Sequence, residues 1–232
     1  MPFFLQSTRY AAFWRQTFVN RFVARCLWGC ALLAPPAFAV PQDLTNLLKI
    51  IESRYNRTQS LKLDFSETYA GTGRPAQTES GVLYLRKPGR MRWEYASPAG
   101  KVFLSDGKEV IQYTPDDPQA IRSKLKESED MRAPLAFLLG KLDFAKEFKS
   151  FQTNVDSSGT WIVAEPKSEN LAYSKVEFLA GADGEIHRVR VTGQDRSKLD
   201  FTFSNEQLNA PVSAAMFAFH APTGVQIVEE GQ

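Results

Sequence analysis

Apolar and charged residues alternate strictly over residues 91–95, which read MRWEY. An alternation with a period of two residues is typical of a β-strand that buries one face. The surrounding stretch, residues 81–115, predicts four consecutive strands joined by short turns. Within it, Asp106-Gly107 predicts a tight hairpin turn of type I′, because such a turn needs residues that tolerate a positive φ. The stretch therefore predicts an antiparallel meander with one apolar side, formed by Met91, Trp93 and Phe103.

The pattern elsewhere in the chain predicts more strands and only a few helices. The first strand of the meander extends back to residue 79, as residues 79–86, and alternating or apolar runs outside the meander predict strands at residues 61–65, 119–125, 148–155, 160–165, 174–179, 186–192 and 198–204. A total of about ten or eleven short, evenly spaced strands is typical of a β-barrel or a β-sandwich. The fold class predicted is therefore mainly β with a few helices.

Two helices and one helical turn are predicted around these strands. After Asp43, residues 44, 47, 48, 51 and 55 place a single apolar stripe along a helix. Residues 135–139 (LAFLL) predict a short helix that is apolar on every side and must be covered all round, by protein or by a ligand. Residues 214–216 predict a last helical turn.

The first 39 residues have the character of a leader. They contain four arginines and no acidic residue, then a short apolar run at residues 26–34 and the small-x-small sequence Ala37-Phe38-Ala39. This pattern predicts a secretory signal peptide that is cleaved after about Ala39 and leaves residues 40–232 as a single domain. Two alternatives stay open, a mitochondrial transit peptide and lipid attachment at Cys30.

Removal of the leader changes the sign of the net charge. Without its four arginines, 24 of the 28 basic residues remain against 26 acidic ones, a formal net charge of about −2. A domain without a positive field lacks the main source of affinity for phosphate backbones, so we expect no nucleic-acid partner. Both cysteines, Cys26 and Cys30, lie in the leader, so the remaining domain has no disulfide and no thiolate.

Patterns for catalysis and metal binding are missing from the sequence. The two histidines, His187 and His220, have neither metal-ligand spacing nor a nucleophile motif beside them. No glycine-rich phosphate loop precedes a predicted helix. We therefore expect no cofactor, no metal and no enzymatic activity. A hydrolase would need a catalytic group that the sequence does not reveal.

Large apolar side chains are abundant, with 17 phenylalanines in the chain. The pattern alone leaves two interpretations open. One is an ordinary core in which helices pack on a sheet. The other is a half-barrel whose inner side forms an apolar cavity under a lid. The helix at residues 135–139 and the methionine and aromatic residues of the meander favour the second interpretation.

Several short motifs carry a family resemblance. They are residues 81–88 (GVLYLRKP), 92–95 (RWEY), 97–98 (SP), 105–108 (SDGK), 133–134 (AP), 184–187 (GEIH), 215–219 (AMFAF) and 222–225 (PTGV). In order and spacing they resemble the outer-membrane lipoprotein carrier proteins, the LolA family of periplasmic chaperones. The resemblance covers nearly all of residues 40–232.

The resemblance implies an incomplete antiparallel β-barrel with a helical lid over an apolar cavity. It also implies a monomeric carrier in the periplasm that binds the acyl chains of lipoproteins. Such a carrier takes its cargo from an inner-membrane ABC lipoprotein-releasing complex and delivers it to an acceptor at the outer membrane. The alternative is a periplasmic module that senses lipids or lipoproteins and regulates a membrane partner. That alternative should carry a second domain, for which residues 40–232 leave little room.

The resemblance also implies which residues form the site. In the family, an arginine directly before the proline of the first motif binds carbonyls of the lid helix, and here that position is Lys87, with Arg86 before it. Alternation along a strand puts Arg86 and Lys87 on opposite faces. We expect Lys87 to be the lid latch and to donate hydrogen bonds to the last carbonyls of the helix at residues 135–139. The residues expected to line the cavity or the lid are Leu48, Phe65, Leu83, Leu85, Met91, Trp93, Phe103, Ile111, Leu135, Phe137 and Leu138.

Overall fold

The computed structural model describes residues 44–71, 73, 75–125 and 142–230. Within these ranges the helices are α1 (Leu44–Arg57), α2 (Phe144–Glu147) and the 3₁₀ helix η2 (Ala214–Phe217). The strands are β1 (Ser60–Ala70), β2 (Gln77–Arg86), β3 (Arg90–Ser97), β4 (Val102–Ser105), β5 (Glu109–Tyr113), β6 (Gln119–Lys124), β7 (Phe148–Asp156), β8 (Gly159–Pro166), β9 (Tyr173–Ala180), β10 (Ile186–Gly193), β11 (Lys198–Leu208) and β12 (Gln226–Glu229).

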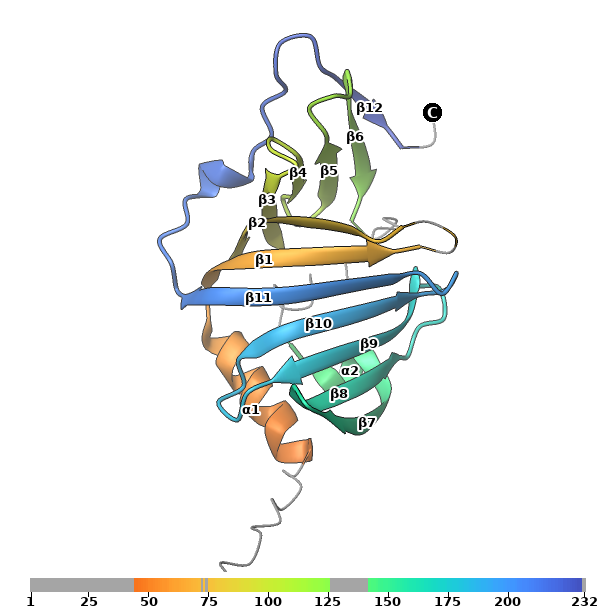
Figure 1. Cartoon of the computed structure of the whole chain (residues 1–232). Coiled ribbons are helices and arrows are strands. Elements are labelled where there is room, and N and C mark those ends of the chain that lie inside the picture. The colour runs from red at the N-terminus through yellow and green to blue at the C-terminus, as the bar shows by residue number, and fades with distance from the viewer. Residues whose placement is uncertain (1–43, 72, 74, 126–141, 231–232) are drawn as a thin grey trace, which may run out of the picture. The chain divides into compact units, whose positions relative to one another are not determined.

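All of these strands belong to one twelve-stranded sheet, in the order β12-β6-β5-β4-β3-β2-β1-β11-β10-β9-β8-β7 (Figure 1). Neighbours are antiparallel, except that β12 runs parallel to β6. The pairing of β1 with β11 joins the two series of hairpins. Because β12 and β7 are separate edges, the sheet is open and does not close into a barrel within the described residues.

One face of the sheet, which we call the inner face, packs on α1. Along β3 the buried residues are Met91, Trp93 and Tyr95, as the alternation predicts. Residues that are directly opposite each other on neighbouring strands share a face. Trp93 therefore lies between Leu83 of β2 and Phe103 of β4 on the inner face. These residues belong to one large core cluster that includes side chains of α1.

Helix α1 covers part of the inner face with a narrow apolar stripe. Its buried residues are Leu47, Ile51 and Tyr55, which are spaced by four and so lie on one side of the helix. Burial of a large apolar side chain contributes about 1.5–3 kcal/mol to stability. Burial of the stripe therefore helps to hold α1 against the sheet.

The outer face of β3, β4 and β5 is covered as well, by the segment that follows β11. Helix η2 contacts β3, and Nη1 of Arg92 donates to the carbonyl oxygen of Met216 at 3.2 Å. The rings of Tyr113 and Phe219 lie 5.8 Å apart. Leu104, Ala120 and Phe217 are buried outside the main core cluster. Apolar side chains therefore occur on both faces of this part of the sheet.

The prediction of a mainly β, open antiparallel sheet is confirmed. Every strand predicted from the sequence has an observed counterpart, but the sheet has twelve strands rather than ten or eleven. The sequence did not predict α2 or β12, each of which is only 4 residues long. The predicted signal peptide and the predicted helix at residues 135–139 lie outside the described residues.

The prediction of a type I′ turn at Asp106-Gly107 is wrong. That turn type needs a positive φ at both central residues, and only Gly107 has one, at 100°. The side chain of Asp106 instead accepts hydrogen bonds from the backbone N–H groups of Lys108 at 2.8 Å and Glu109 at 2.9 Å. The carboxylate thus stabilises a longer connection, in which Asp106 keeps an ordinary φ.

Candidate functional site

Aromatic rings meet at the middle of the inner face. Phe65 of β1 packs against Trp93 with ring centroids 4.7 Å apart and planes at 76°, and against Tyr95 at 5.1 Å. Trp93 also contacts Phe201 of β11 at 5.3 Å. Side chains from three non-consecutive strands thus form one aromatic surface, with Trp93 fully buried in it.

A second aromatic cluster lies where α2 packs on the last strands. It joins Phe144 of α2, Phe148 and Phe151 of β7 and Phe178 of β9, with centroid distances of 5.8 to 6.2 Å. Asp143 caps α2 by accepting a hydrogen bond from the N–H of Lys146 at 3.1 Å, which positions Phe144. Both clusters belong to the same core, so aromatic side chains extend across much of the inner face.

Lys87 contacts the C-terminal end of α1. Its Nζ donates to the carbonyl oxygen of Tyr55 at 2.7 Å and to that of Asn56 at 3.2 Å. The last carbonyls of a helix have no intrahelical donor and carry the negative end of the helix dipole, so they favour an ammonium group. Burial lowers the pKa of Lys87, which offsets part of this gain. Within the described residues these bonds reach α1, not the helix predicted at residues 135–139.

The turn that carries Lys87 is supported by a second turn. Gly89 has a φ of +69°, and a Cβ placed on it would lie 2.8 Å from the Cα of Gly107, in the β4–β5 connection. The two turns therefore pack backbone against backbone. In addition, the N–H of Lys87 donates to the carbonyl oxygen of Gln59 at 2.9 Å, so the main chain at Lys87 is tied to the residues that follow α1.

Arg54 of α1 binds three carboxylates. Its Nη2 lies 2.6 Å from Oε1 of Glu206, whose side chain is only 4% exposed. Its Nη1 lies 3.2 Å from Oδ2 of Asp183, and its Nη2 lies 3.4 Å from Oε2 of Glu185. Burial alone would lower the pKa of Arg54, but the hydrogen bond and the charge of Glu206 raise it above its ordinary value.

The neighbouring Tyr55 is part of the same network. Its hydroxyl donates to Oε2 of Glu206 at 2.8 Å and accepts from the N–H of Ile186 at 3.0 Å. Burial raises the pKa of Tyr55, and the negative charge of Glu206 raises it further. The hydroxyl therefore stays protonated and keeps α1 bonded to β10 and β11.

Two side chains of α1 bind the main chain just before α2. Asn56 donates from Nδ2 to the carbonyl oxygen of Leu142 at 2.8 Å and accepts from the N–H of Leu142 at 2.7 Å. Oε1 of Glu52 accepts from the N–H of Phe144 at 2.8 Å. These bonds mimic the pairing of a strand and fix the chain at residues 142–144 to α1.

Close packing of the β9–β10 turn on α1 depends on Gly184. This residue has a φ of +82°, and a Cβ at this position would lie 2.9 Å from Cγ2 of Ile50 and 3.1 Å from the backbone N of Ile51. Any side chain here would push the turn away from the helix. The C-terminal half of α1 is therefore held by polar contacts and one close backbone approach, while its apolar stripe covers the inner face.

The family model described as outer membrane lipoprotein carrier protein LolA matches residues 56–220. The chain belongs to the LolA family. The outer-membrane lipoprotein carrier protein of Bordetella avium is 31% identical over 215 residues, covering 91% of this chain and 100% of that protein. The protein of the same description from Pseudomonas aeruginosa strain UCBPP-PA14 is 28% identical over 214 residues, covering 90% and 97% of the two chains. The crystal structure of a LolA superfamily protein from Nitrosomonas europaea aligns with a TM-score of 0.45 at 10% identity, covering 75% of this chain and 97% of that one.

Most of the residues expected to line the cavity of this LolA-family chain come together on the inner face. Phe65, Leu83, Leu85, Met91, Trp93 and Phe103 are all buried in the main core cluster. Leu48 is partly buried at the edge of that cluster. Leu135, Phe137 and Leu138 lie outside the described residues. The described inner-face residues thus form a packed surface that α1 helps to cover.

Ile111 is on the wrong face for a cavity residue, and its assignment is corrected here. It lies opposite Leu104 of β4 and Arg122 of β6, whereas the inner-face Phe103 lies opposite Gln112. Ile111 therefore belongs to the outer face. The sequence was misleading because residues 209–220 cover this part of the outer face, so apolar residues occur there as well.

The predicted separation of Arg86 and Lys87 onto opposite faces agrees with their hydrogen bonds. Nη1 of Arg86 donates to the carbonyl oxygen of Val212 at 3.0 Å, in the segment that follows β11. Lys87 bonds to α1 instead. The sequence did not indicate the roles of Arg54, Asn56 and Glu206, because Glu206 and Arg54 are 152 positions apart in the chain.

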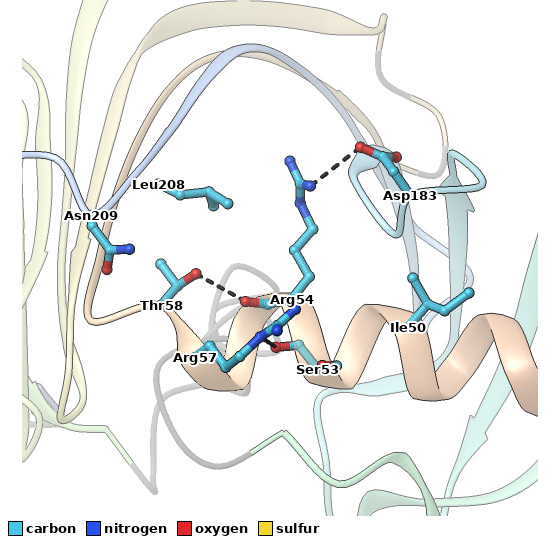
Figure 2. Close-up of a pocket in the computed structure, with 8 residues that line it drawn as sticks. All are labelled: Ile50, Ser53, Arg54, Arg57, Thr58, Asp183, Leu208 and Asn209. Carbon is cyan, nitrogen blue, oxygen red and sulfur yellow. Dashed lines mark hydrogen bonds and ion pairs between the residues drawn. The ribbon is translucent and has the colours of Figure 1, made fainter.

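A separate surface pocket of about 400 Å³ lies between α1 and the end of β11 (Figure 2). It is lined by Ile50, Ser53, Arg54, Arg57, Thr58, Asp183, Leu208 and Asn209. In Figure 2 the side chain of Arg54 extends from α1 toward Asp183. Its charged lining is unsuited to acyl chains, and no residue predicted for the cavity takes part in it.

No group of three or more histidine, cysteine, aspartate or glutamate side chains in the described ranges could hold a metal ion. No helix in the described part of the chain is both long enough and apolar enough to cross a membrane.

Proposed function

We propose that this chain is a periplasmic carrier that binds the acyl chains of lipoproteins between the inner face of its sheet and a helical cover. The observation that carries the proposal is the way α1 is attached. The apolar stripe of α1 belongs to the same core cluster as the aromatic side chains of the inner face, while the helix is anchored at its C-terminal half through exchangeable polar contacts. A cover of this kind can leave the sheet without any covalent change.

The energetics favour exchange of the cover for lipid. Opening α1 exposes apolar surface and breaks hydrogen bonds, each worth about 0.5–1.5 kcal/mol net, or more when charged. Binding of an acyl chain contributes about 0.8 kcal/mol of favourable free energy for each CH₂ group that it buries. A long chain therefore compensates for the opening, and the cost of opening lowers the net affinity enough for transfer to a stronger binder.

Lys87 is the latch of this cover in the proposal. Its ammonium stabilises the closed form through the end of α1, and loss of these bonds should favour the open form. The lipid-contacting surface of the proposal consists of Leu48, Phe65, Leu83, Leu85, Met91, Trp93 and Phe103, with Leu135, Phe137 and Leu138 in the lid. The reaction is binding and release, so no catalytic residue is required.

The proposed pathway follows from the resemblance and from the leader. Residues 1–39 direct export and are cleaved, and the remaining single domain acts as a monomer in the periplasm. Cargo comes from an inner-membrane ABC lipoprotein-releasing complex and passes to an acceptor at the outer membrane. The alternative, a lipid- or lipoprotein-sensing module that regulates a membrane partner, would bind the same lipid but would not pass it on.

Co-purification tests the proposal directly. The full chain is co-expressed with a tagged lipoprotein, and the purified protein is examined by native mass spectrometry for acylated cargo. Transfer of that cargo to outer-membrane vesicles distinguishes a carrier from a sensor. The control is the same lipoprotein without its acylated cysteine. Co-purification of this control as well as the acylated lipoprotein would contradict acyl-chain binding.

Fluorescence quenching locates the lipid. Bromine atoms on an acyl chain quench tryptophan emission at short range, so brominated lipid should quench Trp93 on the inner face. Trp161 is the matched control, because its cross-strand partner is Leu179 and it lies outside the main core cluster. Quenching should persist in Trp161→Phe and disappear in Trp93→Phe. The opposite pattern would place the lipid on the outer face.

A further inference from the structure

The indole N–H of Trp93 lacks a hydrogen-bond acceptor among the described residues, although the side chain is fully buried. Trp161, the other buried tryptophan of the sheet, donates from Nε1 to Oδ2 of Asp156 at 2.9 Å and contacts Oγ of Ser158 at 3.1 Å. A buried tryptophan N–H normally has such a partner. The two tryptophans therefore differ in whether the indole N–H has a hydrogen-bond acceptor, and a buried donor without an acceptor is costly.

The surroundings of Trp93 explain why the chain itself does not satisfy the donor. Its cross-strand neighbours are Leu83 and Phe103, and its ring neighbours are Phe65 and Phe201, none of which has a polar side chain. Elsewhere on this face the hydroxyl of Tyr95 donates to Oε1 of Glu67 at 2.8 Å. Neither of these oxygens accepts a hydrogen bond from the indole nitrogen.

A phenylalanine at this position would fill much of the same space without a buried donor. A water molecule is a poor substitute, because a buried water needs two to four polar partners, and neither the cross-strand neighbours nor the ring neighbours named above have a polar side chain. An N–H···π contact with Phe65 is a weak interaction. The donor is therefore suited to a ligand that brings its own acceptor into an apolar site.

We propose that the Trp93 N–H donates a hydrogen bond to an ester carbonyl oxygen of the lipid on the cargo, where the acyl chains join the glycerol. This inference rests on the proposed function and specifies the chemistry of the same site. An ester carbonyl is an acceptor without a donor or a charge, so it enters an apolar surface at a low desolvation cost. The acyl chains then lie on the aromatic rings beside it.

The consequence is selectivity for ester-linked over ether-linked chains. A site with a buried polar group discriminates against a ligand that leaves this group unpaired. An ether analogue has the same chain length and nearly the same shape but no carbonyl. One net hydrogen bond corresponds to a preference of about 3- to 10-fold for the ester.

The test compares two synthetic lipopeptides with the same peptide and the same chain length, one with ester-linked and one with ether-linked chains on the N-terminal cysteine. Dissociation constants are measured for the full-length wild type, Trp93→Phe and Trp161→Phe. Wild type and Trp161→Phe should prefer the ester by the factor above, and Trp93→Phe should bind both equally. A second readout uses the wild type alone and so does not depend on lipid binding by a variant. In its ¹H–¹⁵N spectrum, the Trp93 indole signal should move downfield with the ester but not with the ether.

The outcomes separate this inference from the proposed function. If wild type binds both lipopeptides equally and the indole signal responds alike to both, the carbonyl is not the acceptor and the inference is overturned, while lipid binding stands. An ester preference that survives Trp93→Phe overturns it in the same way. If neither lipopeptide binds the wild type, the proposed function fails, and the inference fails with it.

Discussion

Replacement of Lys87 by methionine should loosen α1 without changing the inner face. Methionine keeps an unbranched stem of similar length but cannot donate to the carbonyl oxygens of Tyr55 and Asn56, which Lys87 reaches at 2.7 and 3.2 Å. Hydrogen bonds from charged groups are worth roughly 1.5–3 kcal/mol each. The longer bond is at the weak end of the usual distance range, and burial, which lowers the pKa of Lys87, offsets part of the gain.

The net loss should be about 2 kcal/mol, or roughly a 30-fold change in the equilibrium between closed and open α1. Hydrogen exchange followed by mass spectrometry measures this directly, because amides in the last turns of α1 should exchange faster by that factor. Apparent affinity for an acylated peptide should rise by up to the same factor, and transfer of cargo to an acceptor should slow. Lys87→Arg keeps the donors, so amides in the last turns of α1 should exchange as slowly as in the wild type.

Arg86→Met is the matched control for Lys87→Met. It removes one charge from the adjacent position and breaks the bond to the carbonyl oxygen of Val212, on the outer face. It should leave exchange in α1 unchanged. Equal exchange in wild type and Lys87→Met would refute the latch and would mean that apolar packing and the Arg54 network hold α1.

Three further predictions address other parts of the molecule. Gly184→Ala should destabilise the fold by about 1–3 kcal/mol in urea and speed exchange in α1, whereas Gly224→Ala, with φ +87° but nothing within 4 Å of its added Cβ, should leave exchange in α1 unchanged. Burial would raise the pKa of Asp106, but hydrogen bonds from two backbone N–H groups lower it. Its stabilising effect is therefore present above the unfolded pKa near 3.8 and is lost as pH falls below that value toward the lower folded pKa, so Asp106→Asn should flatten the loss of stability in urea titrations below about pH 4. Mass spectrometry of the exported protein should find Val40 at its N-terminus; a lipidated Cys30 there would refute cleavage after Ala39.

Much of the sheet could be predicted because strand formation leaves a local trace. The alternation at residues 91–95 and the turn residues around it predicted β2 to β5 in the correct order. The same reasoning predicted that Trp93 and Phe103 share a face, which the strand register confirms. Side chains alternate along any strand, so a few consecutive residues are enough to reveal the pattern.

The family resemblance, supported by the free carbonyls that any helix end presents, predicted what Lys87 would contact, but not which helix. The ammonium does bind carbonyls at the C-terminal end of a helix, yet that helix is α1, which precedes β1 in the chain. Any helix end presents the same group of free carbonyls. The choice among helices depends on where the sheet places the β2–β3 turn.

The face occupied by Ile111 and the presence of β12 could not be predicted from local sequence patterns. Alternation divides the residues of β5 into two sets, but it does not say which set is inside when a distant segment covers the other face. β12 is a short edge strand with mostly exposed residues, and it forms only because the C-terminal segment returns beside β6. Neither result is encoded within a window of ten residues.

By itself, the sequence determined the strands and the apolar stripe of α1, because each depends on residues that are close together along the chain. The tertiary structure alone decided that Arg54 meets Glu206, that Gly184 lies against α1, and that the N–H of Trp93 has no hydrogen-bond acceptor among the described residues. These contacts join residues on separate strands and turns. They depend on the strand order and the curvature of the whole sheet, which is why no stretch of the sequence shows them.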